Sequence, residues 1–127
     1  MFGIMIIGLT GCSNNKEYKI DLYKLEDVSS ITIDTLSQYD NLSEFTDETT
    51  INKIYNIFKD KVTYKESIGN NPEAPDVLYA VKFNNKNNDS KTIYIYKKEK
   101  DFYIEQPYNG IYEITEKYFN IVESLVK

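Results

Sequence analysis

Three short segments with alternating apolar and polar side chains constrain the fold of this chain more than any other feature of its sequence. They are residues 77–83 (VLYAVKF), 91–98 (KTIYIYKK) and 102–106 (FYIEQ). Alternation with a period of two places apolar side chains on one face of a strand and polar side chains on the other. Short polar links separate the segments, so they predict a three-stranded antiparallel meander. In its second strand, the isoleucines should lie on one face and Tyr94 and Tyr96 on the other.

Two further segments have the spacing of amphipathic helices: residues 46–62 and the segment that follows Thr115. In the first, apolar side chains recur at i, i+3, i+4 and i+7 from Ile51, so they form one stripe that we expect to face the core. Thr46 or Asp47 can cap this helix, because each offers a side-chain oxygen to free backbone N–H groups. Thr115 can cap the second helix in the same way.

The other segments complete the predicted domain. Residues 31–33 alternate like a half-buried strand, residues 36–45 are predicted to be a loop, and residues 63–67 a short strand. Residues 68–76 are rich in Gly, Pro and Asn and predict a loop. We therefore expect an α+β fold of two layers, an antiparallel β-meander with two helices packed on one face, over residues 28–127.

The chain begins with a short apolar run, FGIMIIGL, which ends in the sequence Leu9, Thr10, Gly11, Cys12. The run is much shorter than the roughly 20 residues of a membrane-spanning helix and is typical of the apolar region of a signal peptide. An aliphatic residue, two small residues and a cysteine form the pattern of a bacterial lipobox, whose cysteine thiol receives a diacylglyceryl group. We therefore interpret residues 1–11 as a lipoprotein signal peptide and Cys12 as the lipidation site.

Lipidation of Cys12 predicts a chain anchored to the extracytoplasmic face of the cell membrane by acyl chains such as palmitate. Two acyl chains anchor a protein stably, whereas one gives marginal binding. Residues 12–27 would then be the lipidated cysteine and a polar tether. No basic residue precedes Cys12, which favours either an internal start at Met1 or a truncated signal. The alternative for Cys12 is an inert cysteine buried in an apolar strand.

The composition excludes several kinds of active site. The chain has no histidine and one cysteine, so Ser-His-Asp and Cys-His catalytic groups and His-ligated zinc are impossible. It has no Gly-rich phosphate loop and no G-x-S-x-G motif. We therefore expect no enzyme, no metal and no cofactor. The net charge of −5, with 15 basic residues that are all lysine, also argues against a nucleic-acid partner.

The run YIEQPYNGIYEI, residues 103–114, is the most distinctive stretch of the predicted domain. Asn109 and Gly110 predict a tight turn in which both reach positive φ, and Pro107 should end a strand because it cannot donate to a ladder. One interpretation is structural: the run leads the last strand into the last helix, and its aromatic side chains fill the core. The other is a rim that contacts a ligand or partner. The candidate residues of this rim are Tyr103, Glu105, Gln106, Tyr108 and Asn109.

The lipobox, the strand pair and the EQPYNGIY stretch before a short final helix resemble a family of small uncharacterised lipoproteins of low-GC Gram-positive bacteria. This family is catalogued as a domain of unknown function. The resemblance covers most of residues 20–127 and is carried mainly by EQPYNGIY. It implies a location at the cell surface and the domain boundaries, and it implies no catalytic residues.

Three functional hypotheses follow. The first is a lipid-anchored, non-catalytic domain that binds a protein, a peptide or an envelope component. The second is a regulatory, sensor or immunity-type module that binds a small ligand or a neighbouring membrane protein. The third, an enzyme that uses Asp, Glu and Tyr, ranks last because no residue pattern supplies a nucleophile with an activating base.

Overall fold

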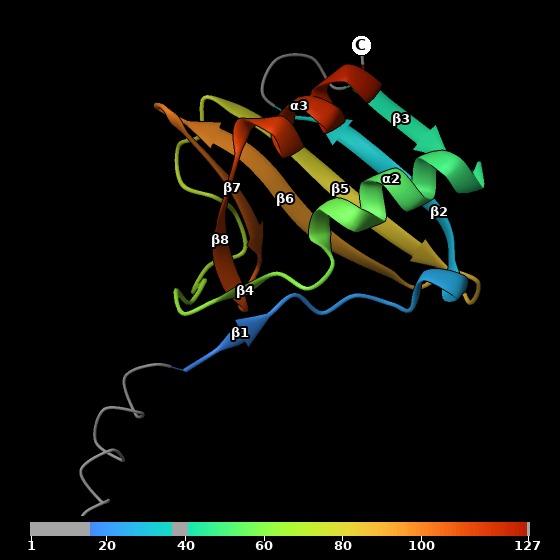
Figure 1. The fold of residues 1–127 in the computed structure, drawn as a ribbon, viewed down its shortest axis with the longest axis horizontal. Helices are drawn as coiled ribbons and strands as arrows, with labels where there is room; N and C mark the ends of the chain where they lie inside the picture. Colours follow the sequence, from blue (N-terminus) through green and yellow to red (C-terminus); the bar gives the residue numbers. More distant parts are fainter. Residues whose placement is uncertain (1–15, 37–40, 127) are drawn as a thin grey trace, which may run out of the picture.

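The computed structural model describes residues 16–36 and 41–126, so the predicted signal peptide and lipobox lie outside the described residues. Six strands form one antiparallel sheet in the order β3-β2-β5-β6-β7-β8, and β1 and β4 form a separate two-stranded ribbon. Both helices cover the same face of the large sheet (Figure 1), so the predicted two-layer α+β fold with a β-meander is confirmed. The elements are β1 (Tyr18–Lys19), the 3-10 turn η2 (Leu25–Asp27), β2 (Val28–Thr35), β3 (Asn41–Phe45), α2 (Glu48–Phe58), β4 (Val62–Thr63), β5 (Val77–Asn85), β6 (Ser90–Lys98), β7 (Asp101–Gln106), β8 (Gly110–Ile114) and α3 (Glu116–Leu125).

The core lies between the helices and one face of the sheet. Ile33, Val81 and Ile93 are paired in register across β2, β5 and β6, and all three are 0% exposed. Successive side chains of a strand point to opposite faces, so Tyr94 and Tyr96 of β6 lie on the face without helices, as predicted. We call this second face the open face.

The helix α2 is fixed by a side-chain cap at one end and by aromatic packing at the other. Of the two predicted caps, Asp47 is the one used: its carboxylate accepts from the Thr50 N–H at 2.9 Å. Phe58 packs edge-on against Phe83, with ring centroids 5.4 Å apart. The helix ends there, earlier than predicted, because the chain turns at Asp60, where φ is 61°. Neither α-helix of the described residues has the length and apolar character needed to cross a membrane.

The helix α3 begins after Thr115, as predicted, but the Thr115 side chain makes no capping hydrogen bond. Its buried side chains, Phe119 and Val122, join the core. Phe119 contacts Phe102 of β7, with ring centroids 5.0 Å apart. This contact fixes α3 over the β7 side of the sheet.

The prediction of a loop over residues 36–45 is wrong for its second half. Asn41–Phe45 forms β3, an edge strand paired antiparallel with β2. Its sequence, NLSEF, lacks the apolar alternation of a half-buried strand, and Leu42 is 68% exposed. The strand forms because β2 offers its free edge, which is a tertiary contact rather than a local preference.

The meander is longer than the predicted three strands, because Gly110–Ile114 returns along β7 as β8. Of the short strand predicted over residues 63–67, only Thr63 lies in a strand, β4 (Val62–Thr63), and Glu66 forms one isolated bridge with Gly110. The rest of that segment crosses to the open face.

The tether predicted over residues 12–27 is corrected for its second part. Tyr18–Lys19 pairs with β4, and the Ile20 N–H donates to the Lys61 carbonyl at 3.3 Å. Ile20, Leu22 and Tyr23 pack against the core. Residues 18–27 therefore belong to the folded domain, which begins well before the predicted boundary at residue 28, because side chains far along the chain hold this segment in place.

Candidate binding groove on the open face of the sheet

The segment between β4 and β5 folds over the open face and forms one wall of a groove. It is tied to the β7–β8 hairpin by backbone hydrogen bonds. The Ile111 N–H donates to the Lys65 carbonyl at 2.9 Å, the Ser67 N–H donates to the Asn109 carbonyl at 3.1 Å, and the Tyr108 N–H donates to the Gly69 carbonyl at 3.3 Å. A loop held at three points can serve as a fixed wall.

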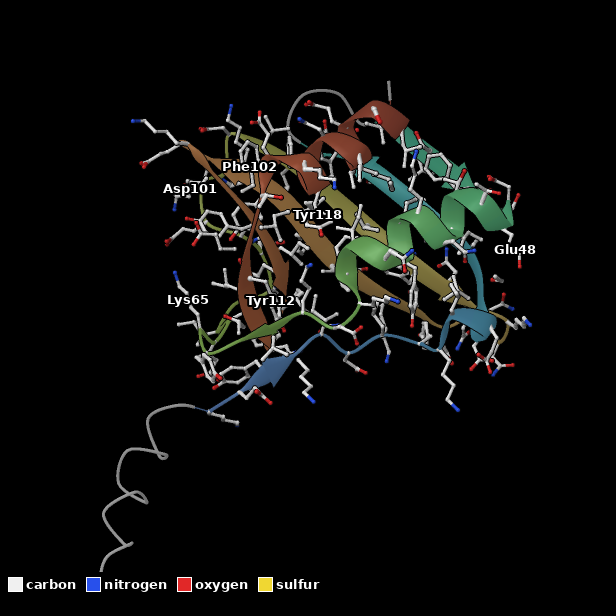
Figure 2. The ribbon with its side chains drawn as sticks, in the orientation of Figure 1. Glu48, Lys65, Asp101, Phe102, Tyr112 and Tyr118 are labelled. Carbon is white, nitrogen blue, oxygen red and sulfur yellow. The ribbon has the colours of Figure 1, made fainter. Side chains whose placement is uncertain are left out.

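The groove lies between this wall and the ends of β6 and β7, and its volume is about 570 Å³. Two of its lining residues, Lys65 and Asp101, are labelled on the left of Figure 2, whereas Glu48 and Tyr118 mark the helices. Five carboxylates and two lysines line the groove, so its potential is negative. They are Glu66, Glu73, Glu99, Asp101, Glu105, Lys65 and Lys98.

Glu105 is the buried charge of the groove, with 5% of its surface exposed. Its carboxylate accepts two hydrogen bonds from neutral donors: the Ser67 hydroxyl at 2.7 Å and the Tyr96 hydroxyl at 3.0 Å. Within residues 16–36 and 41–126, no lysine forms an ion pair with this carboxylate. Burying a carboxylate is costly unless hydrogen bonds and an opposite charge compensate it. Here the protein supplies the hydrogen bonds alone.

Two tyrosines stand beside Glu105 in the groove. The rings of Tyr96 and Tyr103 stack across β6 and β7, with centroids 5.4 Å apart and planes 29° from parallel. Burial raises the pKa of the Tyr96 hydroxyl, and the nearby Glu105 carboxylate raises it further. Desolvation followed by the charges of Asp101 and Glu113 also raises the pKa of Tyr103. Both hydroxyls therefore stay neutral and can donate hydrogen bonds.

The structure splits the predicted rim into two groups. Tyr103 and Glu105 line the groove, and Tyr108 lies at the tip of the β7–β8 turn with 69% exposure. Gln106 is buried instead, and its amide bonds the backbone of Asp21, accepting from the N–H at 2.7 Å and donating to the carbonyl at 2.9 Å. Of the five predicted rim residues, Gln106 therefore does not face the groove, because successive strand side chains point to opposite faces.

Asn109 belongs with Gln106 rather than with the groove. Its side-chain amide donates to the Lys19 carbonyl and, at 2.6 Å, to the Gln106 side chain. The two side chains together clamp the N-terminal segment against the hairpin. The EQPYNGIY stretch thus serves the groove on one face and the N-terminal segment on the other.

The turn itself differs from the prediction. Tyr108, not Asn109 or Gly110, has positive φ, at 60°. The Asn109 N–H donates to the Gln106 carbonyl at 3.0 Å, with Pro107 in the second position, as in a type II turn. Pro107 ends β7, as predicted. Gly110 is required for space: a Cβ there would lie 2.7 Å from Thr63 Cγ2 and 2.8 Å from the Tyr112 hydroxyl oxygen.

Two groove residues, Tyr96 and Ile68, and the buried Ser67 beside the groove have weak or no sequence signals. Tyr96 is predicted to face away from the helices, but nothing in the sequence indicates that it contacts Glu105. Ser67 lies in a polar segment and has no signal at all, because its role depends on a fold-back contact 38 residues away. Ile68 is 82% exposed at the groove, and only the fold places it there.

Among residues 16–36 and 41–126, no group of three or more acidic, cysteine or histidine side chains is arranged to hold a metal ion. Ser67 beside Glu105 has the components of a nucleophile and a base, but Ser67 is 1% exposed. Its hydroxyl is therefore withheld from the groove. The accessible chemistry of the groove consists of aromatic faces, carboxylates and two lysines.

A family model matches most of the chain. The family model DUF5301, described as "Domain of unknown function (DUF5300)", covers residues 16–113. The chain belongs to this family. The DUF5301 region contains β1, the whole groove and the EQPYNGIY stretch, and it ends just before α3.

A solved structure has a similar fold. It is described as "NMR structure of the protein from Ruminococcus gnavus", with 31% sequence identity and a TM-score of 0.62. The similarity covers 78% of this chain and 97% of the other. Among curated proteins, no relative of this DUF5301 chain was found.

Proposed function

We propose that this DUF5301 chain is a lipid-anchored, non-catalytic binding domain on the extracytoplasmic face of the cell membrane. The groove on the open face would take its partner, which is a protein, a peptide or an envelope component. The observation that supports binding most strongly is the buried Glu105 carboxylate, hydrogen-bonded only by neutral groups beside two stacked tyrosines. Convergent polar groups beside aromatic faces in a concave site are typical of recognition sites.

The burial of Ser67 supports the non-catalytic part of the proposal. A nucleophile must reach the substrate, and Ser67 is 1% exposed and does not line the groove, whereas its neighbour Glu105 does. The lipobox pattern ending at Cys12 supports the anchor.

The anchor is tested by the substitution Cys12→Ala. We expect it to abolish fatty-acid labelling and to move the chain from the membrane fraction to the soluble fraction. The neighbouring substitution Ser13→Ala is the control and should leave both unchanged. Unchanged labelling in the Cys12 variant would refute lipidation at this residue.

The groove is tested by passing detergent-solubilised membranes over the immobilised chain. We expect a retained component that is lost with Tyr103→Ala and kept with Tyr64→Ala. Tyr64 is a suitable control because it is 63% exposed and does not line the groove. A component that both variants retain equally binds elsewhere and would contradict the proposal.

The groove volume supports a second candidate, a sensor of a small ligand. A volume of about 570 Å³ falls within the roughly 300–1,000 Å³ of small-molecule sites. A thermal-shift screen of small metabolites separates the two functions. A stabilising compound whose effect disappears with Tyr103→Ala, together with no retained macromolecule, would favour the sensor.

A further inference from the structure

We infer that the groove binds the side chain of a lysine or arginine presented by an extended basic peptide segment. The cationic group would pair with Glu105, and the aliphatic stem would lie along Tyr103. This inference rests on the proposed function and names the chemistry of its partner.

The first step concerns the hydrogen-bond acceptor positions of the Glu105 carboxylate. An ionised carboxylate offers about four acceptor positions, and Ser67 and Tyr96 each donate one hydrogen bond. Further donors and a positive charge would compensate the burial of this group. Charge-assisted hydrogen bonds from ammonium or guanidinium groups are about twice as strong as neutral ones.

The second step concerns the tyrosine pair. Cations are attracted to aromatic faces within about 6 Å of the ring centroid. The chain already contains such a site elsewhere: the Lys91 ammonium lies 4.5 Å from the Tyr23 ring centroid and 2.8 Å from an Asp21 carboxylate oxygen. The groove offers the same two components, an aromatic ring and a carboxylate, and among the described residues neither of its two lysines pairs with Glu105.

The third step concerns the charged residues that surround Glu105 and the two tyrosines. Glu66, Glu73, Glu99 and Asp101 add negative charge, which exceeds the positive charge of the two groove lysines. This field attracts cations and disfavours anionic ligands such as phosphates.

The choice of a peptide over a free amine follows from the apolar part of the groove. Ile68, exposed at 82%, and Ile111 also line it. They offer contacts to apolar residues on either side of a bound lysine, and a small polyamine would leave them unused. Burial of apolar surface would add to the affinity.

The test uses the lipidated chain in lipid nanodiscs and the probe acetyl-Ala-Ile-Lys-Ile-Ala-amide. We expect NMR shifts at the backbone amides of Gly69 and Ile111. Acetylation of the probe lysine removes its charge and should weaken binding about tenfold, equivalent to one lost charge-assisted hydrogen bond. Glu105→Gln should have a similar effect. Glu44→Gln, a carboxylate change on the distant strand β3, should leave binding unchanged.

A second pair of variants covers the case in which Glu105→Gln does not fold. Tyr103→Phe keeps the aromatic face and should bind the lysine probe nearly as well as the original chain. Tyr103→Leu removes that face and should weaken binding. Equal binding by the two variants would contradict the role of the ring.

Several outcomes would overturn the inference. Equal affinity for the acetylated probe would show that charge is not recognised, and no shift with the lysine probe would exclude the ligand class. Displacement by spermidine at lower concentration than the peptide would identify a free polyamine instead. If the probes fail while a membrane component still depends on Tyr103, the inference fails and the proposed function stands. If that component is absent as well, both fail.

Discussion

Gly110 shows how one residue can join two parts of the structure. Its position between Thr63 and Tyr112 leaves no room for a Cβ. We predict that Gly110→Ala destabilises the domain by about 1–3 kcal/mol, the usual cost of overpacking. Urea denaturation measures the change. Gly69→Ala is the matched control, because the nearest atom to its Cβ, the Asn71 carbonyl oxygen, is 3.8 Å away. Equal effects of the two substitutions would contradict the close packing at Gly110.

Tyr112 is a buried tyrosine whose hydroxyl has no hydrogen-bond partner among the described residues. Burial raises the pKa of Tyr112 to about 12, whereas an unfolded tyrosine titrates near 10. Between pH 10 and pH 12, the Tyr112 hydroxyl is therefore ionised in the unfolded state and still protonated in the folded state. The contribution of Tyr112 to the free energy of unfolding is therefore fully present below about pH 10 and decreases as the pH rises toward 12.

The substitution Tyr112→Phe tests this description. We predict unchanged or slightly higher stability at pH 7, because removing an unpaired buried hydroxyl removes a desolvation cost. Between pH 10 and 12, the variant should lose less stability than the original chain. Urea denaturation across this pH range measures both effects. A clear loss of stability at pH 7 would indicate that the hydroxyl has a partner.

At the level of elements, the N-terminal segment depends on a clamp that is distant in sequence. Gln106 bonds both backbone groups of Asp21 and so replaces a strand partner. We predict that Gln106→Ala speeds hydrogen exchange at the Asp21 amide and makes residues 18–23 accessible to proteases, with the large sheet still protected. Lys24→Ala, on an exposed side chain of the same segment, is the control. Unchanged exchange at Asp21 would contradict the clamp.

The elements predicted correctly from sequence are those defined by local patterns. The alternation of residues 77–83 and 91–98 and the stripe of α2 each appear within a few residues, and burial of these side chains then fixes the strands and helix. The edge strand β3, the N-terminal segment and the fold-back of Ser67 onto Glu105 are held by partners distant along the chain. Local preferences do not encode such partners, so two of the five predicted rim residues, Gln106 and Asn109, contact the N-terminal segment rather than the groove.

At the level of the whole molecule, the proposed anchor would hold the domain close to the membrane. Six residues from Cys12 to Tyr18 reach at most about 20 Å when fully extended. The end of the domain that contains β1, β4 and the β7–β8 turn would then lie nearest the membrane (Figure 1). A domain held this close to the membrane suits a partner that is itself attached to the cell envelope.

The most direct measurement of the proposed function is site-specific photo-crosslinking in intact cells. A photoreactive residue at position 98, which lines the groove, is compared with one at position 82, exposed on the open face of β5 outside the groove. We predict a discrete crosslinked product from position 98 that is absent from position 82 and lost with Cys12→Ala. Equal products from both positions, or a product from position 98 that does not depend on Cys12, would contradict a membrane-anchored binding groove.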